Sequence, residues 1–189
     1  MQLERLGALA ADLRKLDEYV DAKMEPYRAQ QKALEGIPGV GAQTARAVLA
    51  EIGADMSVFK DEHHLAAWAG ICPGNNESAG KRLSGRTRKG NTHLRTALVE
   101  ASMAAVRKKG GYLRSKYYPL KTRMGVKRAA VAIAHKILTI AYRILADGTV
   151  YTDLGETYLD SLSKTRTSRH LVRRLEALGF RVQIEPTAA

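Results

Sequence analysis

Residues 69–95 constrain the fold more than any other stretch of the chain. The segment, AGICPGNNESAGKRLSGRTRKGNTHLR, is rich in glycine, lysine and arginine and poor in large apolar side chains. Such a segment cannot bury enough apolar surface to offset the conformational entropy that ordering it would cost. Helices on either side must therefore support it. We expect a loop that displays Ser78 and Ser84 among small residues and cations.

Apolar periodicity predicts the helices that support this loop. Residues 126–146 repeat apolar side chains at four- and three-residue intervals, which indicates a central core helix. Asn91 is a favourable N-cap for a second helix. A short helix over residues 61–69 is expected to anchor Leu65 and Trp68 in the core. The chain is therefore predicted to be mostly α-helical.

The first 34 residues predict a long helix with one apolar stripe. The stripe follows the spacing of a heptad seam and consists of Leu3, Leu6, Ala10, Leu13, Val20, Met24 and Tyr27. Pro26 is expected to kink this helix or to restart it. Two interpretations remain open: the stripe packs on its own domain, or it forms a coiled coil with a second copy or a partner domain.

A glycine-rich turn follows at residues 36–41. The turn lies between two helical patterns, which is typical of a helix-hairpin-helix element. Gly39, Val40 and Gly41 would let backbone N–H groups approach a DNA phosphate at the start of the next helix, where unpaired donors favour anions. The alternative is a tight helical hairpin that binds no ligand.

The end of the chain is expected to be a basic tail. Residues 161–168, SLSKTRTS, have the composition of a linker, and residues 169–178 predict a short basic helix. Residues 180–184 alternate apolar and polar side chains, which predicts one strand. A single strand needs a partner to pair with, so its placement is open.

The charge of the chain favours a nucleic-acid partner. The net charge is +12, and residues 81–128 contain fifteen lysines and arginines but a single acid, Glu100. A cluster of one sign repels itself unless a polyanion replaces its counterions, and binding should then weaken steeply with salt. The predicted nucleic-acid contacts, besides the glycine turn, are Lys81, Arg82, Arg86, Arg88, Lys89, Asn91, Arg95, Lys108 and Lys109.

Composition also limits the other classes of function. The single cysteine, Cys72, excludes an internal disulfide and a cysteine-based zinc site. Aromatic residues make up only 6% of the chain, so platforms for base stacking are scarce. We expect no metal site in this chain. No signal peptide or membrane span is expected either, which predicts a soluble chain of the cytoplasm.

An ordered set of motifs resembles one protein family. The motifs are Ile37-Pro38-Gly39-Val40-Gly41, Trp68-Ala69-Gly70, Pro73, Ser78-Ala79-Gly80, Gly85, Lys89-Gly90-Asn91 and Leu94-Arg95. Together they resemble the C-terminal serine domain of the insertion-sequence transposases that carry a resolvase-like, acidic N-terminal domain. That family includes the bridge-RNA-guided recombinases. The resemblance divides the chain into a connector helix (1–34), a helix-hairpin-helix and serine domain (35–155) and a basic tail (156–189).

The resemblance implies a role for one serine. Ser78 stands where the family places a nucleophile that attacks a DNA phosphodiester and forms a phosphoserine ester, and Ser84 is the second choice. Ala79 replaces the glycine that commonly follows this serine. The family's acidic residues, which bind divalent metal, have no counterpart here. The resemblance therefore implies that Mg²⁺ belongs to a resolvase-like domain in cis or in trans, and that a guide RNA is a possible partner.

Three functions are consistent with these observations. The first is DNA transposition by serine-mediated strand exchange, with the isolated chain inactive until the metal-binding domain joins it. The second is a helix-hairpin-helix module that binds DNA or RNA without chemistry. The third is an oligomerisation fragment built on the N-terminal stripe.

Overall fold

The computed structural model describes residues 2–74 and 76–185. Its elements are α1 (Gln2–Met24), the 3₁₀ turn η1 (Glu25–Tyr27), α2 (Arg28–Glu35), α3 (Ala42–Ile52), η2 (Met56–Val58), α4 (Glu62–Trp68), β1 (Asn76–Ser78), β2 (Lys81–Ser84), α5 (Thr92–Ala105), α6 (Tyr112–Met124), α7 (Val126–Asp147), α8 (Tyr158–Leu162) and α9 (Lys164–Ala177). The prediction of a mostly α-helical chain is confirmed.

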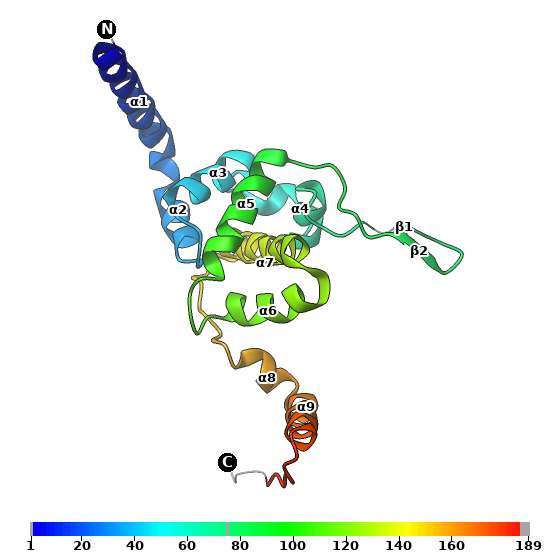
Figure 1. The fold of residues 1–189 in the computed structure, drawn as a ribbon. Helices are drawn as coiled ribbons and strands as arrows, with labels where there is room; N and C mark the ends of the chain where they lie inside the picture. The colour runs from blue at the N-terminus through cyan, green and yellow to red at the C-terminus, as the bar shows by residue number, and fades with distance from the viewer. Residues whose placement is uncertain (1, 75, 186–189) are drawn as a thin grey trace.

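Helix α7 is the centre of the core, as predicted. Helices α2, α4, α5 and α6 pack around it (Figure 1). Its inward face is formed by fully buried side chains, among them Ile133, Ile137 and Leu138. By length and composition α7 is also the one helix among residues 2–74 and 76–185 that could cross a membrane, but half of its apolar window is buried inside the protein. Its apolarity is therefore accounted for by the core.

The helices beside the loop form for the reasons that the sequence indicated, with one exception. The side chain of Asn91 caps α5, because its Oδ1 accepts a hydrogen bond from the N–H of Leu94 at 3.0 Å. Leu65 of α4 is fully buried. The prediction for Trp68 is wrong: its side chain is 43% exposed and lies at the edge of the core, with its ring 5.7 Å from that of Phe59.

The N-terminal helix leaves the core almost entirely. None of the residues of α1 is buried, and Figure 1 shows the helix extending away from the other helices. Pro26 lies in η1, so the chain changes direction there and restarts as α2. The apolar side chains of α1 are exposed along its length, from Leu3 to Val20. Met24, at the end of the helix, packs on the core, but the apolar side chains from Leu3 to Val20 do not.

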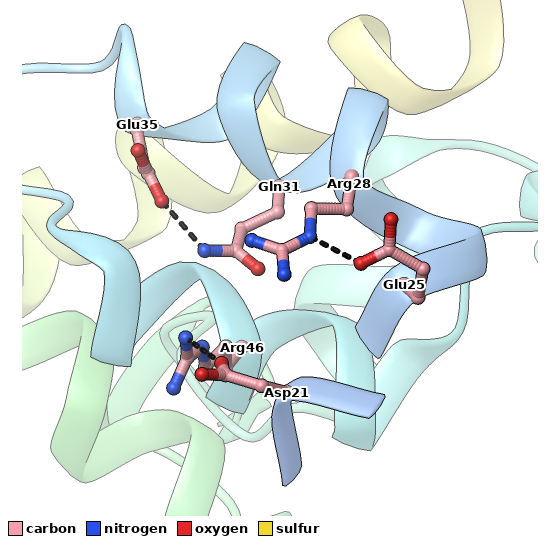
Figure 2. Close-up of polar contacts among 6 residues, drawn as sticks. All are labelled: Asp21, Glu25, Arg28, Gln31, Glu35 and Arg46. Atoms are coloured by element: carbon pink, nitrogen blue, oxygen red, sulfur yellow. Dashed lines mark hydrogen bonds and ion pairs between the residues drawn. The ribbon is translucent and has the colours of Figure 1, made fainter. Parts of the chain in front are cut away.

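Polar contacts fix the direction in which α1 leaves (Figure 2). Arg46 of α3 forms an ion pair with Asp21 of α1 at 2.5 Å. Arg28 at the start of α2 reaches back to Glu25 of η1 at 2.6 Å. The pair that joins α1 to α3 is partly buried, so water screens it less than it screens a fully exposed pair. These contacts hold the base of an otherwise solvated helix.

The tail differs from the prediction in two ways. Residues 161–168 are not a linker, because they complete α8 and begin α9 with a turn at Ser163 between them. Serine hydroxyls are accommodated in these helices by donating to backbone carbonyls one turn earlier: Ser161 to Tyr158 and Ser168 to Lys164, both at 2.8 Å. Residues 180–184 form no strand. The sheet that the described residues contain, β1–β2, lies away from the tail (Figure 1).

Candidate nucleic-acid interface and serine hairpin

Part of the predicted loop folds into a β-hairpin that carries Ser78 at its tip. Strands β1 and β2 pair antiparallel, with Ser78 opposite Lys81 and Glu77 opposite Arg82. The two residues between the strands have positive φ angles, 50° at Ala79 and 74° at Gly80. Positive φ at both positions is the pattern of a type I′ turn, which matches the twist of paired strands. Figure 1 shows the hairpin projecting away from the helices.

The turn holds one residue in an unfavourable backbone conformation. Ala79 is the one described residue other than glycine with a positive φ. An L-residue in this region brings its Cβ too close to the next carbonyl, which costs roughly 1–2 kcal/mol. We therefore predict that Ala79→Gly strengthens the hairpin, and that the N–H of Lys81 exchanges with solvent several-fold more slowly. Hydrogen exchange by NMR measures this, and an unchanged rate would contradict the strain.

Glycines bring the two arms of the hairpin together where it leaves the helices. A Cβ on Gly90 would lie 2.4 Å from the nitrogen of Gly70, and one on Gly74 would lie 2.3 Å from the carbonyl oxygen of Arg86. The N–H of Gly74 also donates to that oxygen at 3.1 Å. Any side chain at these glycines would push the arms apart. The glycines of this segment therefore allow the two arms of the hairpin to pack closely where they leave the helices.

Asn91 is engaged inside the protein. Besides capping α5 with Oδ1, its amide Nδ2 donates to Oε2 of Glu51 on α3. Both ends of the side chain therefore fix the point where the hairpin returns to the core. Sequence reasoning missed Glu51, because forty positions separate it from Asn91 and no local pattern connects them.

The two candidate serines differ in their surroundings. The hydroxyl of Ser84 accepts a hydrogen bond from the N–H of Arg86 at 3.1 Å, and the residue is half-buried. Ser78 is exposed, and no hydrogen bond within the described residues engages its hydroxyl. Ser78 therefore has the more accessible oxygen. Ser84 has a local structural role in the turn that leads out of β2.

The predicted cations fall into two groups. Lys81, Arg86, Arg88 and Lys89 are exposed on the hairpin or on the arm that follows it. Arg82 belongs to β2, and its side chain is outside the described part of the structure; Arg95 is half-buried on α5. Lys108 and Lys109 follow the far end of α5, a helix of 14 residues and thus about 21 Å in length. Lys108 and Lys109 therefore lie away from the hairpin.

Two of the three residues predicted to contact DNA in the glycine turn pack against the rest of the protein, and one is exposed. Gly39 has a φ of +83°, and a Cβ there would lie 2.2 Å from the carbonyl oxygen of Ala101 on α5. Val40 is buried. Gly41 is exposed at the start of α3, and a Cβ there would meet nothing within 4 Å. Of the three predicted contacts, Gly41 is the one that a phosphate could approach.

Asp153 fixes the segment after α7 to the start of α6. Its carboxylate accepts hydrogen bonds from the N–H groups of Tyr112 at 2.9 Å and Gly155 at 3.1 Å, and from Lys108 Nζ at 3.2 Å. Burial opposes ionisation, but these donors outweigh it and lower the pKa of Asp153. The Lys108 ammonium is thus already paired within the protein.

The carboxylate of Asp153 is expected to contribute to the free energy of unfolding in a way that depends on pH. Asp153→Asn should lower the free energy of unfolding by about 1 kcal/mol at neutral pH. Because the pKa of Asp153 is lower in the folded state, its contribution is present above the unfolded pKa and is lost as pH falls through the folded pKa. Urea unfolding of both proteins at neutral and acid pH measures the difference. A difference of equal size at both pH values would contradict this assignment.

The side chains that could bind a metal ion do not cluster among the described residues. No group of three or more His, Cys, Asp or Glu side chains comes together within residues 2–74 and 76–185. The acids of α1, such as Asp12 and Asp17, lie on an exposed helix.

Sequence comparison identifies relatives of known class. The chain is 33% identical over 156 residues to a transposase for insertion sequence element IS1111A of Coxiella burnetii, a match that covers 77% of this chain and 43% of the relative. It is 33% identical over 150 residues to a putative transposase of Sinorhizobium fredii, covering 76% of this chain and 38% of the relative. A probable family 20 transposase of Pseudomonas aeruginosa is 30% identical over 152 residues, a match that covers 78% of this chain and 44% of the relative.

The matches cover only part of the length of these relatives. The chain spans roughly two-fifths of the length of the curated relatives it matches. Residues 31–118 match the family described as transposase IS116/IS110/IS902. That range includes the glycine turn, the serine hairpin and α5. Residues 31–118 of this chain are thus similar to the domain that this transposase family shares.

Proposed function

We propose that this chain acts in DNA transposition as the serine-bearing half of a two-part active site. The observation that carries the proposal is the hairpin: an exposed hydroxyl, Ser78, at the tip of a projecting element whose outgoing arm is lined with cations. The relatives named as transposases support the class of reaction. The proposal identifies the domain with the C-terminal serine domain of such enzymes.

The proposed chemistry is a transesterification at phosphorus. The Oγ of Ser78 attacks a DNA phosphodiester, an Oγ–P bond forms, and one bond from phosphorus to a deoxyribose oxygen breaks. The released deoxyribose oxygen takes up a proton, and the serine proton leaves to solvent. A covalent phosphoester conserves the bond energy for rejoining, so no external energy source is needed. In a second transesterification a hydroxyl of another DNA end attacks the phosphoserine, the Oγ–P bond breaks, the attacking hydroxyl gives up its proton and Ser78 takes one up.

The cations of the hairpin would serve this step in two ways. Lys81 lies directly across the turn from Ser78 in the strand register, where its charge can offset negative charge on a phosphorane. Arg86, Arg88 and Lys89 lie further along the outgoing arm, where they can hold the flanking phosphates. Phosphate binding thus positions the strand, and the turn offers the nucleophile.

The other partners belong to the same proposal. Mg²⁺ would be held by a resolvase-like domain in cis or in trans, and a guide RNA is a further candidate ligand of the basic surface. The exposed stripe of α1 would pair with a second copy, because a helix with no buried residue leaves its apolar side chains in water. Residues 180–185 carry no role in this proposal.

A second candidate function is a binding module without chemistry. Gly41 is exposed at the start of α3, where unpaired N–H groups can bind a phosphate in the manner of a helix-hairpin-helix element. In that case the hairpin would add affinity only. The trapping of a covalent protein–DNA adduct that requires Ser78 separates the two functions.

The binding step is tested by neutralising cations. Arg86, Arg88 and Lys89 changed together to glutamine should weaken DNA binding at low salt and make the dependence on salt less steep by about 2.7 in the slope of log K against log salt. The matched control removes the same charge from α1 by changing Arg5, Arg14 and Lys15. Equal losses in both variants, or an affinity independent of salt, would contradict phosphate contact by the hairpin.

A further inference from the structure

The C-terminal helix carries a basic surface that the proposed active site does not use. Helix α9 contains five lysines and arginines and one acid, Glu176. Three of its arginines, Arg166, Arg169 and Arg173, recur at three- and four-residue spacing, so they form one ridge along the helix. All three are exposed. We call these three residues the arginine ridge.

The arginine ridge has no partner within the protein. Among the described residues, none of its three guanidinium groups forms a hydrogen bond or an ion pair. Like charges at this spacing repel one another and destabilise a helix. Helix α1 shows the contrast, because its five acidic and four basic residues are interspersed, as on an ordinary solvated face. The composition of α9 therefore indicates an external anionic partner.

The position of α9 places this partner beyond the helical core. Helix α9 packs on α8, which packs on α6 (Figure 1). No residue of α9 is buried, so the whole ridge is available. The hairpin leaves the core elsewhere, from the segment between α4 and α5. The arginine ridge is thus a surface separate from the hairpin.

The leucines of α9 make a membrane surface the alternative partner. Leu171, Leu175 and Leu178 form a second ridge on the side of the helix opposite the arginines. Leucines opposite cations are also the pattern of a helix that lies on a membrane with its leucines in the bilayer. A nucleic-acid backbone needs only the arginine side, and it is favoured here because the exposed cations of the hairpin suit the same polyanion.

We propose that the arginine ridge of α9 binds the phosphate backbone of duplex DNA, outside the stretch that the hairpin contacts. The inference rests on the proposed function, because it assumes that the chain works on DNA. A straight ridge that rises over seven residue steps, about 10.5 Å, can contact successive phosphates of one strand. Guanidinium groups suit this role because their donors match phosphate oxygens. The ridge would add affinity and orientation without reading sequence.

The test changes Arg166, Arg169 and Arg173 together to glutamine in the whole chain and measures binding to a mixed-sequence DNA duplex. We expect affinity at low salt to fall roughly 10-fold or more, and the salt slope to become less steep by about 2.7. The control variant changes Arg5, Arg14 and Lys15 of α1 and should bind nearly as the wild type. Changing the three ridge arginines to lysine should restore most of the affinity, because the charge is kept.

The outcomes separate this inference from the proposed function. Unchanged DNA affinity in the ridge variant, while the hairpin variant is weakened, overturns the inference and leaves the proposed function standing. Failure of the wild type to bind DNA at all overturns both. A ridge variant that keeps its DNA affinity but loses affinity for an RNA duplex or for anionic vesicles also overturns it. Far-ultraviolet circular dichroism of the variant should match the wild type, because the exchanged side chains are all exposed.

Discussion

Replacing Gly39 with alanine is expected to destabilise the domain by roughly 2–5 kcal/mol. Two effects add at this position. Its φ of +83° is unfavourable for any L-residue, and the new Cβ would lie 2.2 Å from the carbonyl oxygen of Ala101 and 2.5 Å from the nitrogen of Ala105. Both neighbours are backbone atoms of α5, so no side chain can rotate away. The turn or α5 would have to move.

The neighbouring glycine provides the matched control. Gly41 has an ordinary φ of −93°, and a Cβ there meets nothing within 4 Å. Gly41→Ala should therefore leave stability within about 0.5 kcal/mol of the wild type. Urea unfolding followed by circular dichroism compares the two variants. Equal unfolding midpoints would show that α5 does not approach the turn as closely as described.

Gly39 and Gly41 also show what the sequence alone could not predict. The pattern of glycines predicted a tight turn between two helices, because only glycine allows the backbone geometry such turns use. It could not show that one glycine faces α5 and the other faces solvent. That distinction depends on α5, which lies about sixty residues further along the chain. Local patterns carry no information about such a contact.

The helix predictions succeeded because they depend on interactions between residues that are close in the sequence. Helix α7 and the cap at Asn91 were predictable because periodicity and capping act within a few residues. Trp68 was misplaced because a large apolar residue at the end of a helix can lie at the edge of the core as easily as inside it. The tail was mispredicted because serine and threonine favour linkers only on average.

The hairpin itself was the largest omission. Its turn, Ala79-Gly80, lacks the asparagine or aspartate that usually marks a two-residue hairpin turn. Its strands are short and polar, so alternation of apolar residues gave no signal. Sequence reasoning correctly placed a basic, glycine-rich segment around Ser78, but not the turn that sets Ser78 opposite Lys81.

Replacing Ser78 with alanine is expected to abolish covalent attachment of the protein to DNA. The reaction would contain cognate DNA ends, Mg²⁺ and the resolvase-like partner domain proposed above. Adduct formation should fall by a factor on the order of 1,000 or more, because no other group can replace a nucleophile that forms the covalent bond. Denaturing gel electrophoresis of labelled DNA measures the adduct. DNA affinity should remain close to that of the wild type, since Ser78→Ala removes no charge.

Ser84→Ala is the control that makes the result specific. Ser84 lies on the same hairpin, but its oxygen accepts a hydrogen bond from the N–H of Arg86 and the residue is half-buried. Its loss should cost about 1 kcal/mol of local stability and leave the adduct largely intact. The reverse result, an adduct that survives Ser78→Ala and disappears with Ser84→Ala, would assign the nucleophile to Ser84. An adduct that survives both changes would remove the hydroxyls of the hairpin from the chemistry and leave the domain as a DNA-binding module.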